Sequence, residues 1–304
     1  YQVLKDTISS ENTAVGYQAG YSTTSPYNTY IGHKAGYSAT TGERNTAVGR
    51  TALTNNTASY NTAVGMEALQ ANTSGSYNTA VGTETLSRNT TSNYNTAIGM
   101  YAGSYVGQAA DEVENTFVGY KAGFYRTAGQ ECVMVGSNAG YSAGTGHGCT
   151  LVGRAAGYFL TSDTWATFIG HQAGYNVSGT TYNTAVGKSS MGGGSGTSGD
   201  YNTALGANVF YNITSGGQNI GIGYGAGYNI NTGGENVMIG VDSGSAIQDA
   251  TKCTYVGHLA GAQNVSSTEN TFIGYGAGRL RTAGIDNVFV GSYAGYAAGS
   301  GCCN

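Results

Sequence analysis

The sequence is poor in proline, in charge and in long apolar runs. Its 304 residues include one proline, Pro26, and charged residues make up 9% of the chain, against ~25% in an average domain. Proline is scarce and glycine does not recur at every third position, which together exclude a collagen helix. Lys and Arg number 12 against 16 Asp and Glu, which argues against nucleic acid or an anionic membrane as a partner. No apolar run reaches about 18 residues, so no membrane-spanning helix is predicted.

Residues that carry catalysis or bind metals are also few. The four histidines and the acidic residues are scattered, and no segment gathers a nucleophile, a base and an orienting acid, so we expect no enzyme. Three histidines share one slot in distant repeat units and do not converge on one ion: His33, His171 and His258. An acidic loop holds Asp111, Glu112 and Glu114, for which Ca²⁺ binding is the alternative to simple solvation. We therefore predict no metal and no cofactor.

A short repeat fills the chain. The motif Asn12-Thr-Ala-Val-Gly16 occurs, with variants, 17 times in all. We call its terminal glycines the motif glycines, and twelve of the 16 spacings between them are 17 residues. This period is too short for helical hairpins or propeller blades. It predicts an all-β parallel β-solenoid of about 17 coils, formed by residues 1–304 as one domain. Two lengthened units, near 104–114 and 191–200, predict loop insertions; a domain boundary at the glycine-rich run 191–200 is the alternative.

Alternation within the motif assigns side chains to the two faces of each strand. The residue three before the motif glycine is always Thr, Val or Ile, and the residue one before it is Val, Ile or Leu. These two columns share one face, which we expect to point into the coil. Four residues before the glycine, thirteen asparagines should form a hydrogen-bonded ladder: Asn12, Asn28, Asn45, Asn61, Asn78, Asn95, Asn115, Asn183, Asn202, Asn219, Asn236, Asn270 and Asn287.

The middle residue of the strand should then point outward. This column carries no charge in any unit, and a strand that is apolar on both faces is buried on both. We expect it to pack against sister chains, so that the chain is not a monomer. The predicted interface comprises Tyr30, Phe117, Met134, Leu151, Phe168, Met238, Tyr255, Phe272 and Phe289.

Tyrosine, with 25 copies, provides the best candidate binding residues. Five residues after the motif glycine, aromatic side chains form a column. A purely structural stack is one interpretation, and contact with glycans is the other. The column comprises Tyr21, Tyr37, Phe124, Tyr141, Tyr158, Tyr175, Tyr211, Tyr228 and Tyr296.

The motif Asn-Thr-Ala-Val-Gly followed by x-x-Ala, at Asn12, Asn61 and (with Ile for Val) Asn95, resembles the head repeats of YadA-like trimeric autotransporter adhesins and the repeats of viral or phage-like tail fibres. The resemblance covers essentially the whole chain. It implies a left-handed β-roll, assembled as a homotrimer in an extracellular fibre on a cell or virion surface. Because residue 1 enters midway through a coil and neither end carries a polar cap, we expect a piece of a longer array, or ends covered by end-to-end contact.

Cysteines and glycosylation sequons leave alternatives open. Cys132, Cys149 and Cys253 replace ladder asparagines; a Cys132–Cys149 disulfide is the alternative to free thiols, and the pair Cys302-Cys303 could join a neighbouring segment. Six sequon asparagines should lie along one loop edge, either as turn formers or as glycan carriers: Asn55, Asn72, Asn89, Asn176, Asn212 and Asn264.

These observations favour a structural and adhesive extracellular fibre segment that associates with itself and contacts a cell surface or glycan. A purely structural filament shaft is one alternative. An ice-binding solenoid is the other, and the inward orientation expected for the Thr column argues against it.

Overall fold

The computed structural model describes residues 11–106, 113–162, 164–193, 196, 199–280 and 283–297. Contacts divide the chain into two compact units, Tyr1–Cys149 and Thr150–Asn304. This division does not fall at the glycine-rich run 191–200. The described residues form strands and turns without a helix, which confirms the predicted all-β parallel β-solenoid with a repeat of about 17 residues.

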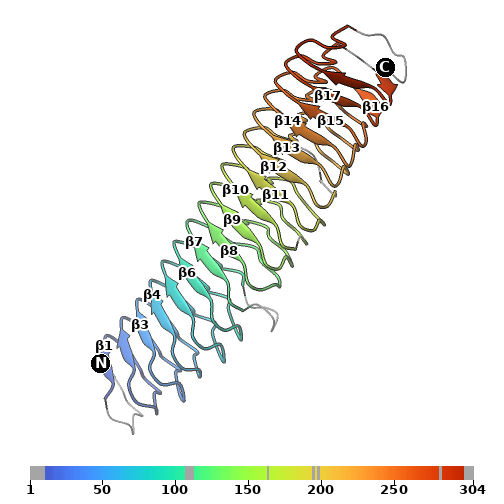
Figure 1. Ribbon diagram of the computed structural model, residues 1–304. Helices are drawn as coiled ribbons and strands as arrows, with labels where there is room; N and C mark the ends of the chain where they lie inside the picture. The colour runs from blue at the N-terminus through green and yellow to red at the C-terminus, as the bar shows by residue number, and fades with distance from the viewer. Residues whose placement is uncertain are drawn as a thin grey trace. The chain divides into compact units, whose positions relative to one another are not determined.

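Unit 1 contributes one three-residue strand per coil to a parallel sheet. Neighbouring strands pair in register, as Thr62 pairs with Thr79 and Ala63 with Ala80. Figure 1 shows these strands following one another in chain order, from blue to green. They are β1 (Thr13–Val15), β2 (Thr29–Ile31), β3 (Thr46–Val48), β4 (Thr62–Val64), β5 (Thr79–Val81), β6 (Thr96–Ile98), β7 (Thr116–Val118) and β8 (Val133–Val135).

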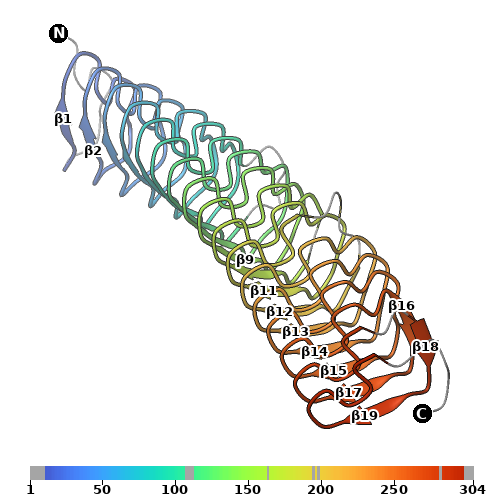
Figure 2. The ribbon, with the colours of Figure 1, turned by 90° about the horizontal axis from the view of Figure 1, so that it is seen from above.

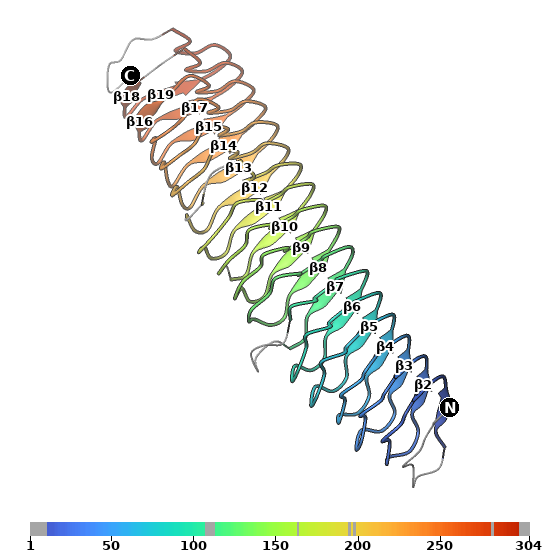
Figure 3. The same cartoon turned by 180° about the vertical axis from the view of Figure 1, so that it is seen from behind.

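Unit 2 repeats this arrangement, as the view from behind shows (Figure 3). Its motif strands are β9 (Thr150–Val152), β10 (Thr167–Ile169), β11 (Thr184–Val186), β12 (Thr203–Leu205), β13 (Ile220–Ile222), β14 (Val237–Ile239), β15 (Thr254–Val256), β17 (Thr271–Ile273) and β19 (Val288–Val290). A separate two-stranded sheet joins β16 (Ser266–Thr268) to β18 (Ala283–Ile285). Figure 2 shows this small sheet apart from β17 and β19.

The motif glycine ends each strand because only glycine fits there. Gly65 has a φ of 141°, in a region of backbone conformation that is essentially closed to other residues. A Cβ atom on Gly65 would lie 2.3 Å from the carbonyl oxygen of Gly82 in the next coil. The other motif glycines have φ between 126° and 141°, so the chain turns the same way after each strand.

The orientation predicted for the strand was wrong. The middle residue of the motif points into the coil, so the column predicted as an oligomer interface forms the core of its own chain. Phe289 is partly exposed. The other eight predicted interface side chains are fully buried: Tyr30, Phe117, Met134, Leu151, Phe168, Met238, Tyr255 and Phe272.

Size complementarity inside each coil explains the inward orientation. Where the middle strand residue is large, the residue six positions later is glycine: a Cβ on Gly123 would lie 2.3 Å from the ring of Phe117. In five of the seven coils whose middle residue is alanine, a large side chain six positions later fills the space instead, as fully buried Leu86 does in the coil of Ala80. In the coil of Ala97 the later residue is Gly103, and Leu86 and Phe117 of the neighbouring coils border that position. The two positions share one volume, which a close-packed interior requires.

Candidate functional site

The first candidate site is the outer face of the motif strands. It consists of the first and third residues of β1–β8 in unit 1, and the corresponding residues of β9–β15, β17 and β19 in unit 2; we call it the Thr/Val face. None of these side chains is buried, and Val81 and Ile98 are 37% and 43% exposed. The face carries no charged residue. Each unit therefore presents a regular row of methyl and hydroxyl groups to its surroundings.

The predicted aromatic column lies half-buried at the surface, except for buried Phe124. Its rings stack in pairs, with Tyr21 and Tyr37 centroids 5.2 Å apart and Tyr158 and Tyr175 centroids 5.1 Å apart, each pair inclined by 20°. Stacking covers one face of each ring in a pair, and partial burial reduces the rest of the ring surface that a sugar could reach. Sugars pack against ring faces, and this geometry therefore favours the structural interpretation for most of the column.

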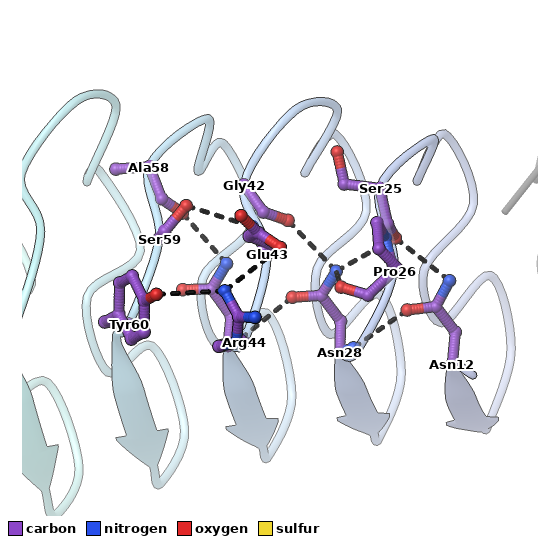
Figure 4. Close-up of polar contacts among 11 residues, drawn as sticks. Asn12, Ser25, Pro26, Asn28, Gly42, Glu43, Arg44, Ala58, Ser59 and Tyr60 are labelled. Carbon is purple, nitrogen blue, oxygen red and sulfur yellow. Dashed lines mark hydrogen bonds and ion pairs between the residues drawn. The ribbon is translucent and has the colours of Figure 1, made fainter. Parts of the chain in front are cut away.

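A second aromatic row, which the sequence reasoning missed, occupies the position immediately before the ladder asparagine. Tyr60 and Tyr77 stack at 4.8 Å and Tyr77 and Tyr94 at 5.1 Å. Arg44 extends the row, since its Nη1 donates a hydrogen bond of 2.9 Å to the Tyr60 hydroxyl (Figure 4). The recurring Tyr-Asn-Thr triplet is the sequence signal that could have revealed this row.

The asparagine ladder joins each coil to the next. The backbone N–H of Asn28 donates to Oδ1 of Asn12 at 2.8 Å, and Nδ2 of Asn28 donates to the Gly42 carbonyl at 3.0 Å (Figure 4). The same backbone-to-side-chain bond spans 20 residues from Asn115 to Asn95. It also spans 19 residues from Asn202 to Asn183. The ladder therefore continues across both predicted insertions, whose loops lie partly outside the described residues.

Cys132 occupies a ladder position beside a fully buried arginine. Nη2 of Arg126 donates to Cys132 Sγ at 3.3 Å and to the Gly146 carbonyl at 2.6 Å. Cys132 Sγ also accepts the backbone N–H of Cys149 at 3.3 Å. A hydrogen bond from the Cys149 thiol and the charge of Arg126 lower the pKa of Cys132 to about 6, although burial raises it. A buried guanidinium is costly without an anionic partner, and a Cys132 thiolate, which the lowered pKa favours, would pair with Arg126.

The structure contains Cys132, Cys149 and Cys253 as free, buried thiols. A disulfide between Cys132 and Cys149 would remove the thiolate and leave Arg126 as an uncompensated charge in the core. This arrangement favours the reduced pair over the disulfide that the sequence left open. The pair Cys302-Cys303 lies outside the described residues.

Acidification should destabilise the folded chain through Cys132. Because the folded-state pKa is about 6 and that of an unperturbed thiol is about 8.5, the stabilisation is complete above about pH 8.5. It is lost as pH falls through about 6. Thermal unfolding followed by circular dichroism between pH 9 and 5.5 measures this. Arg126→Leu with Cys132→Asn, which restores the ladder side chain, should remove this part of the pH dependence; an identical pH profile would contradict the assignment.

The sequon asparagines do not share one exposed edge, contrary to expectation. Asn55 is exposed, whereas Asn176 and Asn212 are half-buried. Asn72, Asn89 and Asn264 are fully buried. Nδ2 of Asn89 donates to Oδ1 of Asn72 at 3.0 Å, which makes these two residues part of an inner polar ladder. Buried amides cannot carry glycans in the folded chain, so three of the six predicted sites are structural.

Within the part of the chain that the structure describes, no three His, Cys, Asp or Glu side chains gather to hold a metal ion. His33 and His258 lie against Tyr17 and Tyr275, while His171 contacts Arg154. Of the acidic loop, Glu114 is described, and Asp111 and Glu112 lie outside the described residues. The described part of the chain forms no helix with the length and hydrophobicity needed to span a membrane.

Comparison with protein-family models and with curated proteins gives no match for this chain. The Thr/Val face and the aromatic rows are therefore the basis for proposing a function for this chain.

Proposed function

We propose that this chain is a structural and adhesive segment of an extracellular fibre, in which several copies pack together through the Thr/Val face. The observation that carries the proposal is the solvent-accessible, charge-free row of Thr, Val, Ile and Leu side chains along the motif strands of each unit. Monomeric proteins rarely expose apolar patches larger than a few hundred Å². An apolar strand face still needs a partner, but that face consists of the first and third strand residues and not, as expected, of the middle residue.

Cyclic symmetry supplies the simplest partner, because identical copies can place the same face around a common axis. The resemblance to trimeric adhesin heads makes three the expected copy number. The exposed tyrosines of the row that precedes the asparagine ladder then remain available for adhesion. Nothing in this arrangement requires a cofactor or a catalytic group.

The mass in solution tests this proposal. Light scattering should give three times the 30.9 kDa of the chain for the wild type. Val64→Glu with Val81→Glu should give single chains that keep their β-structure, because both side chains are solvent-accessible in the single chain. Burying carboxylates in an apolar interface without partners costs several kcal/mol.

Ser74→Glu with Thr91→Glu is the matched control. These residues are exposed in loops of neighbouring coils, so two carboxylates there should leave the mass unchanged. A wild-type mass near 31 kDa, or a Val64/Val81 variant that assembles normally, would contradict packing through the Thr/Val face.

Ice binding is a second candidate, favoured by one observation. The Thr column faces outward, so the reason for rejecting an ice-binding surface no longer holds. Threonines paired in register, as Thr62 is with Thr79, repeat at the ~4.8 Å spacing of a β-sheet. The Thr column is not fully regular, because four coils carry valine or isoleucine at this position: Val133, Ile220, Val237 and Val288. Thermal hysteresis in a wild-type chain of single-chain mass would favour this candidate over the fibre.

A further inference from the structure

Unit 2 has a shallow hollow of about 430 Å³ on its surface, formed by three consecutive coils. Asp200 and Tyr201 line it from one coil, Ser215 and Gln218 from the next, and Glu235 from the third, with glycine backbone forming the remaining wall. Its volume falls in the range of small-ligand sites, about 300–1,000 Å³. All five of these side chains belong to described residues.

The hollow lies where two consecutive coils lack a side chain at one position. Two residues before the ladder position, the preceding coil carries Asp200 and the following coil Thr251, whereas the two coils between them carry Gly217 and Gly234. The backbone stays regular, since the Gln218 N–H donates to the Asp200 carbonyl at 2.8 Å. Neither glycine has a φ in the left-handed region. The backbone therefore does not require glycine at these two positions. The absence of side chains there leaves the space of the hollow open.

The hollow lies where an aromatic row ends. Tyr201 stacks on Tyr182 with centroids 5.3 Å apart and planes inclined by 13°, which covers one face of its ring. The next coil has Gln218 at this position instead of another ring, and Tyr201 is 54% exposed. Among the described residues, Tyr201 therefore has a second ring face that no other aromatic ring covers.

Polar side chains around this ring are available to a ligand. Gln218 and Glu235 are exposed, and among the described residues their side chains form no hydrogen bond or ion pair. Asp200 uses Oδ1 to accept the Thr181 N–H at 2.7 Å, which leaves Oδ2 for other donors. The nearby Lys252 is directed to Glu269, at 3.9 Å. The lining therefore offers carboxylate acceptors, one amide and no positive charge.

We propose that this hollow binds an uncharged pyranose unit of a glycan, with the Tyr201 ring against its apolar face and Asp200, Gln218 and Glu235 bonded to its hydroxyl groups. An aromatic ring packs against C–H groups, and carboxylates form strong hydrogen bonds with hydroxyl donors. Two carboxylates repel acidic sugars, and the nearby Lys252 is directed to Glu269 and not into the hollow. The inference rests on the adhesive part of the proposed function and gives it a site.

Saturation-transfer NMR on the full chain tests the proposal, with methyl glycosides of glucose, galactose, mannose and N-acetylglucosamine as probes and N-acetylneuraminic acid as the acidic comparison. We expect transfer to at least one uncharged glycoside and none to the acid. Gly217→Thr with Gly234→Thr should abolish the transfer, because threonine side chains, like that of Thr251 at this position in the following coil, would fill the hollow. Cβ atoms there meet backbone oxygens at 3.0–3.1 Å, so small adjustments accommodate them.

Tyr201→Ser should also abolish the signal, while Tyr94→Ser, a change at the same position in unit 1, should retain it. Thermal unfolding of each variant verifies that the fold is intact. Absence of transfer to every uncharged glycoside, or unchanged transfer in the Gly217/Gly234 variant, overturns the site. Transfer to the acidic sugar alone also overturns it. A chain that assembles through the Thr/Val face but shows no transfer would retain the proposed fibre and lose only this inference.

Discussion

Replacing Phe117 by alanine should lower the free energy of unfolding by about 3–5 kcal/mol, and adding Gly123→Leu should recover much of that loss. Phe117 is fully buried, so its removal leaves a cavity. A side chain on Gly123 would enter the space of the Phe117 ring, with a Cβ only 2.3 Å away. The double variant recreates the pair formed by Ala80 and Leu86, which fills the coil from the other side.

Gly123→Leu alone should destabilise the chain, because leucine would overlap the Phe117 ring. The backbone itself tolerates leucine there: Gly123 has a φ of 60°, and Leu86 has a φ of 48° at the same position of its coil. Chemical denaturation of the four variants at one protein concentration gives the coupling energy. Additive losses in the double variant would show that the two positions do not share one volume.

Gly65→Ala should cost at least about 3 kcal/mol, for two reasons that can be separated. The φ of 141° imposes strain of about 1–3 kcal/mol on a residue other than glycine. In addition, the new Cβ would lie 2.3 Å from the Gly82 carbonyl oxygen, which forces neighbouring coils apart. Denaturation midpoints of the wild type and the variant measure the total.

Gly291→Ala is the matched control for the backbone term. Gly291 has a φ of 126°, but among the described residues a Cβ there would meet only the Ala294 Cβ, at 4.0 Å. Its loss should therefore contain the strain without the contact between coils. Equal losses at Gly65 and Gly291 would contradict the explanation that coil spacing requires the motif glycine.

The sequence predicted the period, the strand positions and the parallel stacking, because all three follow from where the motif glycines fall. It did not predict which strand face points inward. Alternation along a strand separates its two faces but does not show which face points inward. The first and third strand residues, which are mostly β-branched, resemble a core more than the middle residue does, since the middle residue varies from Ala63 to Phe117. The orientation was nevertheless readable from the exchange of sizes between the middle strand residue and the residue six positions later, as in Ala80 with Leu86 and Phe117 with Gly123.

The candidate sites were less accessible to sequence reasoning. The aromatic columns could be found because they repeat at fixed offsets, but whether ring faces are open depends on how neighbouring coils stack them. The hollow beside Tyr201 needs three facts to coincide across coils: an aromatic row that ends, two glycines in one column, and free polar groups next to both. The residues concerned can all be read in the sequence, but their proximity becomes apparent only when residues one coil apart are placed side by side.

The asparagine ladder has a consequence for how such chains can vary. Its backbone-to-side-chain bond keeps a length of 2.8–3.1 Å whether it spans 16, 17, 19 or 20 residues. The spacing between coils is therefore independent of loop length, and each coil behaves as a cassette whose loop can be exchanged without disturbing the rest. Foreign peptides inserted in the lengthened segments near 104–114 or 191–200 should then leave the ladder of their unit intact, and evolution can alter one loop of the array while the scaffold stays the same.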